Sequence, residues 1–259
     1  MKRIMLTIAY DGSKYCGWQI QPNAITVQEV LNQHLSALLN EKIETMGASR
    51  TDTGVHALGN VAVFDSSTRI PGEKISYALN QRLPEDIRIQ DSREVAADFH
   101  PRYTNSHKTY EYRILNRKFP LPTLRNLAYF TYVPLDVGQM QKAAAYLVGK
   151  HDFKAFCGSQ AQVKTTVREI TDLSVEKEGD MIVIRVTGTG FLYHMVRIIA
   201  GTLMEVGKGA VAPEDMKGIL ESCRRSEAGS TAPACGLTLM GITFENEYLA
   251  AQSAPARRV

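Results

Sequence analysis

The order of apolar and polar residues predicts an α+β protein. In the first hundred residues, short runs of β-favouring residues flank a stripe of apolar residues at helical spacing. Thr26 and Glu29 form a capping-box pair in front of that stripe, which predicts a helix beginning at Val27. The predicted elements here are strands at 4–10 and 60–64, a helix at 27–39, and strand ends at 87–89 and 95–99.

The second half begins near Lys108, where aromatic and β-branched residues predict a strand with Tyr110, Tyr112 and Ile114 on one face. Several strands with hairpins, and helices able to cover one face of a sheet, are typical of the α+β class. The further predicted elements are a helix from Asp136 closed by Gly149, a hairpin of 167–175 and 181–186 joined across Glu178-Gly179-Asp180, a helix from Phe191 to Val206 ended by Gly207, a short helix with Pro213 in its first turn, and a last strand at 237–244.

Composition fits a soluble globular chain able to bury a core. The 259 residues are 44% hydrophobic and 22% charged, with a net charge of +3, so any nucleic-acid partner requires locally gathered positive charge. Neither a secretory signal nor a membrane helix is expected, and the four cysteines suggest neither a zinc site nor a disulfide framework. A cytoplasmic protein with free thiols is the expectation.

The stretch Gly47–Ala57 is predicted to be a site loop, because small, charged and hydroxyl side chains gather there between a helix and a strand. Its glycines permit tight backbone geometry, and Arg50 lies two residues before Asp52, which favours an ionised carboxylate. A modest capping or surface pair would give the same pattern.

Asp52-Thr53-Gly54 is also the D-T-G triplet of aspartic proteases, whose chemistry needs two carboxylates that share a proton. The chain holds no second such triplet, and Arg50 favours the ionised form. A homodimer could supply the second copy, so the sequence weakens this alternative without removing it.

Basic residues gather between His100 and Arg125, where six of them accompany one acid, Glu111. Aromatic residues are interleaved with them, a mixture typical of surfaces that hold phosphates and stack exposed bases. A solvated strand with long basic side chains is the alternative. The basic residues are Arg102, Lys108, Arg113, Arg117, Lys118 and Arg125, and the aromatic ones are Tyr103, Tyr110, Tyr112 and Phe119.

Arg197 lies near the start of a predicted helix, where the helix dipole does not favour a cation, so a carboxylate or phosphate partner is expected. His194, one turn earlier, is more typical of a structural hydrogen-bonding histidine than of a catalyst.

Five ordered motifs closely resemble the tRNA pseudouridine synthase A type, along nearly the whole chain. Residue 53 is commonly Ala or Lys in that family and is Thr here. The motifs are Tyr10-Asp11-Gly12 with Gly17-Trp18-Gln19, Gly47 to Ala57, Lys108-Thr109-Tyr110-Glu111-Tyr112, Phe191 to Arg197, and Gly236-Leu237-Thr238-Leu239.

The resemblance implies isomerisation of uridine to pseudouridine in the anticodon arm of tRNA, around tRNA positions 38 to 40, without a cofactor or metal. The target base would be flipped out of the RNA. It also implies the pseudouridine synthase fold, a central, mostly antiparallel sheet built from two similar α+β halves with a catalytic cleft between them, and a homodimer. The predicted halves are 1–104 and 105–247, followed by a frayed tail at 248–259.

The resemblance also assigns roles to individual residues. Asp52 matches the catalytic carboxylate, acting as a nucleophile on the nucleotide or as a base at the ribose. Tyr110 matches the active-site tyrosine that stacks on uracil and helps to move the C5 proton. The substrate-binding residues implied are Arg197 as the cation paired with the catalytic carboxylate, Lys108 at the RNA, and Leu237 as an apolar wall against the base. Arg50 would contact the RNA backbone or fill the space vacated by the flipped base.

A catalytically silent RNA-binding module would use the same basic and aromatic surface. The two hypotheses differ at Asp52, which only the enzyme needs.

Overall fold

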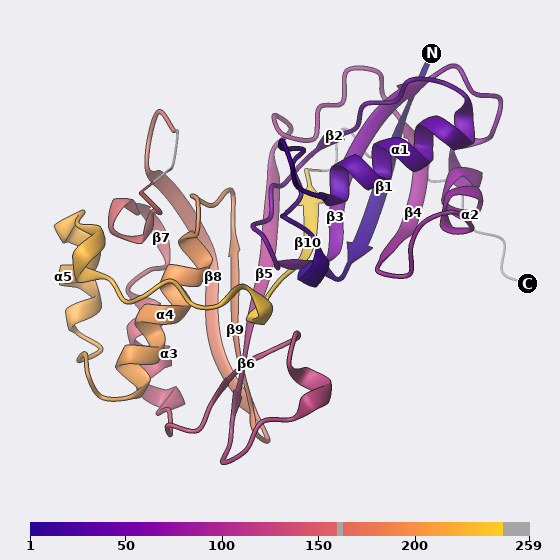
Figure 1. Cartoon of the computed structure of the whole chain (residues 1–259). Coiled ribbons are helices and arrows are strands. Elements are labelled where there is room, and N and C mark those ends of the chain that lie inside the picture. Colours follow the sequence, from indigo (N-terminus) through magenta and orange to yellow (C-terminus); the bar gives the residue numbers. More distant parts are fainter. Residues whose placement is uncertain (160–162, 246–259) are drawn as a thin grey trace, which may run out of the picture. The chain divides into compact units, whose positions relative to one another are not determined.

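The computed structural model describes residues 1–159 and 163–245, and the predicted tail at 248–259 lies outside them. The fold is α+β with a large, mostly antiparallel sheet. The chain divides into two compact units, which we call unit 1 (residues 1–53, 57–106 and 241–259) and unit 2 (residues 54–56 and 107–240). Strand β10, yellow in Figure 1, runs from unit 2 into unit 1.

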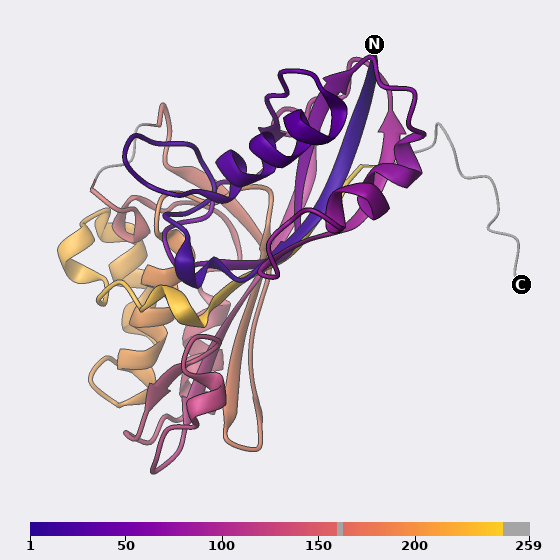
Figure 2. The same cartoon turned by 45° about the vertical axis from the view of Figure 1, so that its right-hand side comes forward.

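Unit 1 is built on three long antiparallel strands in the order β4, β1, β3, with the short strand β2 paired to β3. Helix α1 contacts α2, and α2 packs against β4 (Figure 2). The elements are β1 (Lys2–Tyr10), α1 (Val27–Leu39), β2 (Met46–Gly47), β3 (His56–Ser66), α2 (Ile75–Asn80) and β4 (Ile87–Val95).

The core of unit 1 follows from the alternation of residues along β1. Ile4, Leu6 and Ile8 are fully buried, as are the α1 residues Val27, Leu31 and Leu35. Met5, on the other face, joins a second cluster. Strand β3 is apolar on both faces, because Val61 and Val63 join the second cluster and the alternating residues Ala62 and Phe64 are also buried. The second cluster consists of Met5, Ala48, Val61, Val63, Phe99 and Phe244.

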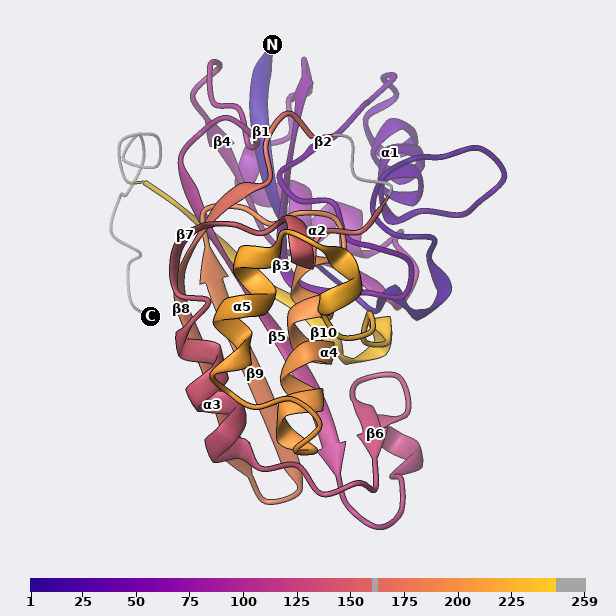
Figure 3. The same cartoon turned by 90° about the vertical axis from the view of Figure 1, so that its left-hand side faces the viewer.

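Unit 2 is built on strands in the order β5, β9, β8, β7, all antiparallel neighbours, with β6 parallel to β5. Helices α3, α4 and α5 cover one face of these strands (Figure 3). The elements are β5 (Ser106–Asn116), β6 (Tyr129–Thr131), α3 (Val137–Ala145), β7 (Gly149–Asp152), β8 (Val167–Glu178), β9 (Met181–Gly188), α4 (Met195–Gly207), α5 (Asp215–Ser222) and β10 (Leu237–Phe244).

Most predicted elements are confirmed, several with longer bounds. Strand β1, the helix capped by Thr26, strand β5 and the final strand all form where the pattern placed them. The predicted hairpin is β8 and β9, joined by the two residues Gly179 and Asp180, with Gly179 at φ +59°. The turn therefore uses the glycine where a left-handed backbone is needed.

Three predicted helix bounds are wrong. The short helix predicted to have Pro213 in its first turn begins at Asp215 as α5, so Pro213 lies before it. The helix placed at Phe191 begins at Met195 as α4, because His194 has φ +60° and a left-handed residue cannot continue an α-helix. The helix placed from Asp136 to Gly149 ends at Ala145, and Gly149, at φ +111°, begins β7 instead.

The predicted strand residues 87–89 are confirmed as the start of β4, which continues without a break to Val95. The predicted strand at 95–99 is wrong beyond Val95, because residues 96–99 lie outside β4. The exposed polar residues in its middle hid the strand. The predicted loop is also shorter, because Gly47 belongs to β2 and His56 and Ala57 to β3. Strands β2, β6 and β7 and helix α2 were not predicted, each being too short to show a period.

Candidate functional site

The loop between β2 and β3 carries Arg50, which is exposed, and Asp52, which is half-buried, and both belong to unit 1. A buried network of hydrogen bonds between uncharged groups holds the loop in place. The Tyr10 hydroxyl lies 2.8 Å from Thr51 Oγ1. The amide of Asn60 donates to Tyr10 Oη at 3.3 Å and to the Ser49 carbonyl at 3.2 Å. The residues flanking Arg50 are thus fixed by groups that carry no charge.

Two close backbone approaches also hold this loop. The Trp18 amide donates to the Thr51 carbonyl at 3.1 Å. Gly17 has φ +80°, and a Cβ there would lie 2.5 Å from the Thr51 oxygen. The buried Trp18 ring packs against Gly47, where a Cβ would lie 2.4 Å from Nε1. The motif Tyr10 to Gln19, which sequence reasoning left without a role, supports the loop that carries Asp52.

Unit 2 holds the other predicted residues. Tyr110, on β5, is 6% exposed, and its ring meets Phe191 edge to face at 5.3 Å. Lys108, half-buried, lies two residues earlier on the same strand, at the register position opposite Gly188. Alternation places Lys108 and Tyr110 on one face of β5. The structure therefore brings Tyr110 together with the Phe191 motif of the sequence.

Arg197 lies in the first turn of α4, and its Nε donates to the Ala232 carbonyl at 2.7 Å. The Ala232 amide donates in turn to the Arg197 carbonyl at 3.1 Å. A backbone carbonyl is thus one partner of a side chain for which a carboxylate or phosphate was expected. His194 precedes α4 and its ring stacks on Tyr193 at 3.7 Å.

Leu237, 5% exposed, begins β10 directly after the segment held by Arg197. Tyr112 holds the same segment from β5, because its hydroxyl donates to the Pro233 carbonyl at 2.9 Å. A Cβ on Gly236 would lie 2.7 Å from the Tyr112 ring. Burial raises the pKa of Tyr112, so this hydroxyl stays a donor. The sequence placed Tyr112 on one face of a strand and among the aromatic residues of the basic segment, and did not predict this hydrogen bond.

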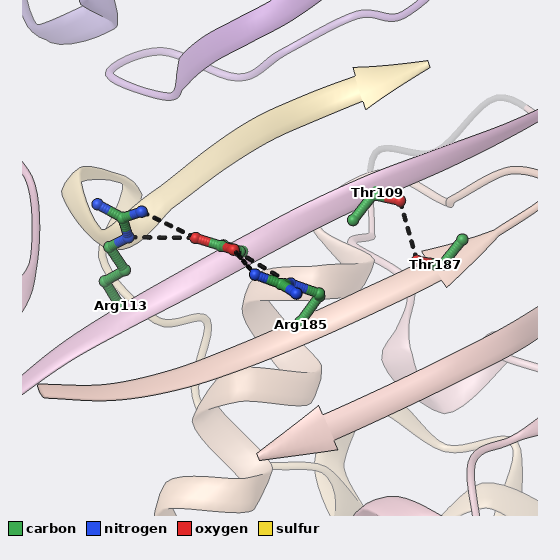
Figure 4. Close-up of polar contacts among 5 residues, drawn as sticks. Thr109, Arg113, Arg185 and Thr187 are labelled. Carbon is green, nitrogen blue, oxygen red and sulfur yellow. Dashed lines mark hydrogen bonds and ion pairs between the residues drawn. The ribbon is translucent and has the colours of Figure 1, made fainter. Parts of the chain in front are cut away.

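Glu111 is the centre of an ionic cluster on the face of β5 turned away from Tyr110 (Figure 4). Arg113 Nη2 donates to Oε2 at 2.9 Å, and Arg185 Nε, from β9, donates to Oε1 at 3.1 Å. Burial works to raise the pKa of Glu111, but the hydrogen bonds from Arg185 and Arg113 lower it overall. The cluster uses both oxygens of the only acid in the basic segment.

Two cations of the basic segment 100–125 form ion pairs with carboxylates of the described chain. Arg113 forms an ion pair with Glu111, and Arg117 Nη1 lies 3.5 Å from Asp180 Oδ2. Of the four aromatic residues, Tyr110 and Tyr112 are buried, whereas Tyr103 and Phe119 are exposed. Of these four rings, Tyr103 and Phe119 are the two that are exposed to solvent in the structure.

Within residues 1–159 and 163–245, no group of three or more His, Cys, Asp or Glu side chains could hold a metal ion. Over the same ranges no helix is long and apolar enough to cross a membrane. The four cysteines form no disulfide with one another.

The family of the chain follows from comparison with known proteins. A family model described as tRNA pseudouridine synthase matches residues 6–104 and 143–245. The chain belongs to the tRNA pseudouridine synthase family and is therefore an isomerase that converts uridine to pseudouridine in tRNA. This excludes the aspartic protease interpretation of the D-T-G triplet. The two matched segments leave residues 105–142, which carry Lys108 and Tyr110, between them.

Individual relatives narrow the resemblance to one type within that family. The chain is 51% identical over 245 residues to a protein of Ruminiclostridium cellulolyticum and 49% identical over 244 residues to one of Acetivibrio thermocellus. It is 48% identical over 244 residues to a protein of a Thermoanaerobacter species. Each match covers 94% of this chain and 100% of the relative, and each relative is called tRNA pseudouridine synthase A.

Proposed function

We propose that the chain forms pseudouridine in the anticodon stem-loop of tRNA, around tRNA positions 38 to 40, with Asp52 as the catalytic carboxylate. The observation that carries the proposal is the loop at 48–53, which holds a half-buried aspartate above a fully hydrogen-bonded, neutral network. Thr51, which this network holds, directly precedes Asp52, so the network keeps the carboxylate in a defined position.

The reaction needs only a carboxylate and a route for protons, since it is an isomerisation. The N-glycosidic bond breaks, the uracil turns, and a C–C bond forms from C5 to the ribose, while C5 loses its proton and N1 gains one. Asp52 acts either as a nucleophile on the nucleotide or as a base at the ribose. The target base is flipped out of the RNA at a cost of a few kcal/mol. No cofactor enters this scheme.

The other residues bind or position the RNA in this proposal. Tyr110 stacks on uracil and relays the C5 proton, and Leu237 forms an apolar wall against the base. Arg197 is the cation for the catalytic carboxylate. Lys108 and Arg50 contact the RNA backbone. The protein acts in the cytoplasm as a homodimer whose two basic surfaces grip one tRNA.

Asp52→Asn tests the proposal, because it removes the charge and keeps the shape of the side chain. We expect tRNA binding to persist and pseudouridine formation to fall to background, measured as conversion of uridine in a tRNA transcript. Asp91→Asn is the matched control, because Asp91 is an exposed aspartate on β4 of the same unit. It should retain full activity.

Undiminished conversion by Asp52→Asn would contradict the assigned mechanism. Binding of tRNA without conversion by the wild-type protein would favour the silent RNA-binding alternative. Mapping of pseudouridine in total tRNA after deletion of the protein tests the position, since loss should be confined to the anticodon arm.

A further inference from the structure

Tyr103 is an exposed aromatic ring held in a defined orientation. It is 83% exposed, the most of any aromatic side chain among the exposed large hydrophobic residues that the structure describes. Its ring stacks on His100 with centroids 4.1 Å apart and planes 24° from parallel. An aromatic ring that is so exposed leaves its second face open to solvent. Such a ring has the geometry on which an unpaired base can stack.

The turn that carries this ring is rigid. The amides of Tyr103 and Thr104 donate to the His100 carbonyl at 3.1 and 3.0 Å. The Arg102 amide donates to His100 Nδ1 at 3.2 Å, which fixes the imidazole under the tyrosine. Phe99, one residue earlier, is fully buried and meets Phe244 edge to face at 5.1 Å. The platform therefore needs little ordering when a ligand binds.

Arg102 ties the turn to the loop of Asp52. Its Nε donates to the Gly47 carbonyl at 2.9 Å, so residues 55 positions apart in the chain lie together at the start of that loop. The pKa of Arg102 is lowered by burial and by the charge of Arg50. Arg50 lies three residues after Gly47 in the loop that Arg102 contacts, and Tyr103 directly follows Arg102. Neither Arg50 nor Arg102 forms an ion pair with a carboxylate in the part of the chain that the structure describes.

We propose that Tyr103, stacked on His100, is a platform for an unpaired RNA base, and that Arg50 and Arg102 hold a phosphate of the same strand. This rests on the proposed function and adds a binding site to it. Two cations left without carboxylates favour a polyanion over a protein surface, and an exposed ring adds the stacking that single-stranded RNA requires. The base belongs to a nucleotide of the tRNA loop other than the uridine that reacts.

Tyr103→Leu is the primary test, with Tyr103→Phe as the variant that keeps the ring. We expect the Kd for an unmodified tRNA transcript to rise about tenfold in Tyr103→Leu, the loss of one base stack, and to stay near wild type in Tyr103→Phe. Tyr77→Leu is the matched control. Tyr77 is an exposed tyrosine of unit 1, but it lies on α2 against β4, whereas the Asp52 loop begins at β2 beside β3.

The phosphate contact is tested separately by Arg50→Gln. Because Arg50 is exposed, its replacement leaves the core of unit 1 intact. We expect the slope of log Kd against log salt concentration to fall by about one, the value for one lost phosphate contact on an RNA strand.

The outcomes separate this inference from the proposed function. If wild type makes pseudouridine while Tyr103→Leu and Tyr77→Leu bind tRNA equally well, the platform is wrong and the enzyme assignment stands. If wild type converts no uridine, the proposed function fails even where Tyr103→Leu weakens binding. A change of oligomeric state in Tyr103→Leu by light scattering, with tRNA affinity intact, would assign the ring to an interface between copies of the chain and overturn the proposal.

Discussion

Two of the hydrogen-bonded polar clusters in this protein, one in each unit, differ in charge. In unit 1, Tyr10, Thr51 and Asn60 form a neutral network, and all three are at most 8% exposed. In unit 2, Glu111 is 3% exposed but its two arginine partners are about half exposed. The neutral cluster supports the loop of Asp52, whereas the ionic one crosses two strands.

Because of this difference in charge, the stability of the Asp52 loop and the reaction rate should depend on pH in different ways. A hydroxyl and an amide do not titrate near neutral pH, so the network beneath the Asp52 loop stays unchanged there. The lowered pKa of Glu111 makes the ionic cluster titrate in acid. A pH–rate profile between pH 5 and 8 should therefore report groups that react or bind RNA, rather than a loosened loop.

Asn60→Asp breaks the neutral cluster and has the largest expected effect. The variant is isosteric, but it loses both donors and places a charge at a fully buried position. We expect the free energy of unfolding at pH 7 to fall by about 3 kcal/mol or more, measured by urea denaturation. Asn126→Asp, at an exposed position, is the control and should change stability little.

The pH dependence of Asn60→Asp has a definite sign. Burial raises the pKa of the introduced carboxyl in the folded state, so the loss develops as pH rises above the unfolded value of about 4. Lowering the pH towards 4 should therefore restore part of the stability. A loss of under 1 kcal/mol at pH 7 would show that the network does not depend on the Asn60 donors.

Glu111→Gln breaks the ionic cluster and has the second largest effect. It removes the charge that both arginines bind, and we expect a loss of about 2 kcal/mol at pH 7, reduced from a fully buried value because the guanidinium groups meet water. Glu178→Gln, at the exposed end of β8, is the control.

Here the sign is opposite to that of Asn60→Asp. Because the pKa of Glu111 is lowered on folding, the wild type has the full contribution above the ordinary value of 4.5 and loses it as pH falls through the folded pKa. The difference between wild type and Glu111→Gln should therefore shrink below pH 4.5. A difference that stays constant down to pH 3 would contradict the ionic origin of the stabilisation.

Much of the fold was predictable because the signals are local. The Thr26 cap, the alternation in β1 and the Gly179 turn each depend on residues a few positions apart. The start of α4 could not be predicted, because nothing in the sequence pattern shows that His194 adopts a left-handed backbone. A continuous apolar run made the helix look four residues longer than it is.

Only part of the site could be predicted, because local sequence signals do not show which distant residues come into contact. The loop of Asp52 could be found from its composition, but Asn60 resembles any strand residue until Tyr10, fifty positions earlier, is placed beside it. Glu111 and Arg185 are 74 positions apart. Partners brought together by strand pairing leave no spacing signal, so buried polar residues were the ones missed.

Tyr10→Phe is a milder change to the neutral cluster. It removes the hydroxyl from Thr51 and Asn60 while the ring keeps its contact with Trp18. We expect a loss of about 1 kcal/mol that does not vary between pH 5 and 8. Since Thr51 adjoins Asp52, kcat for pseudouridine formation should fall more than KM rises. Tyr132→Phe, at an exposed tyrosine, is the control, and equal effects of the two variants would contradict the supporting role of Tyr10.

Thr187→Val has the smallest expected effect. It tests whether the ionic cluster of Glu111 depends on the neighbouring pair of threonines. Thr109 and Thr187 are opposite residues on β5 and β9, and their hydroxyls lie 2.9 Å apart (Figure 4). Valine keeps the shape, so only the hydrogen bond is lost, at about 0.5 kcal/mol. A double-mutant cycle with Glu111→Gln should give a coupling near zero, because each hydrogen-bonded set is complete without the other. A coupling above about 0.5 kcal/mol would mean that the threonine pair and the ionic cluster act as one unit across β5 and β9.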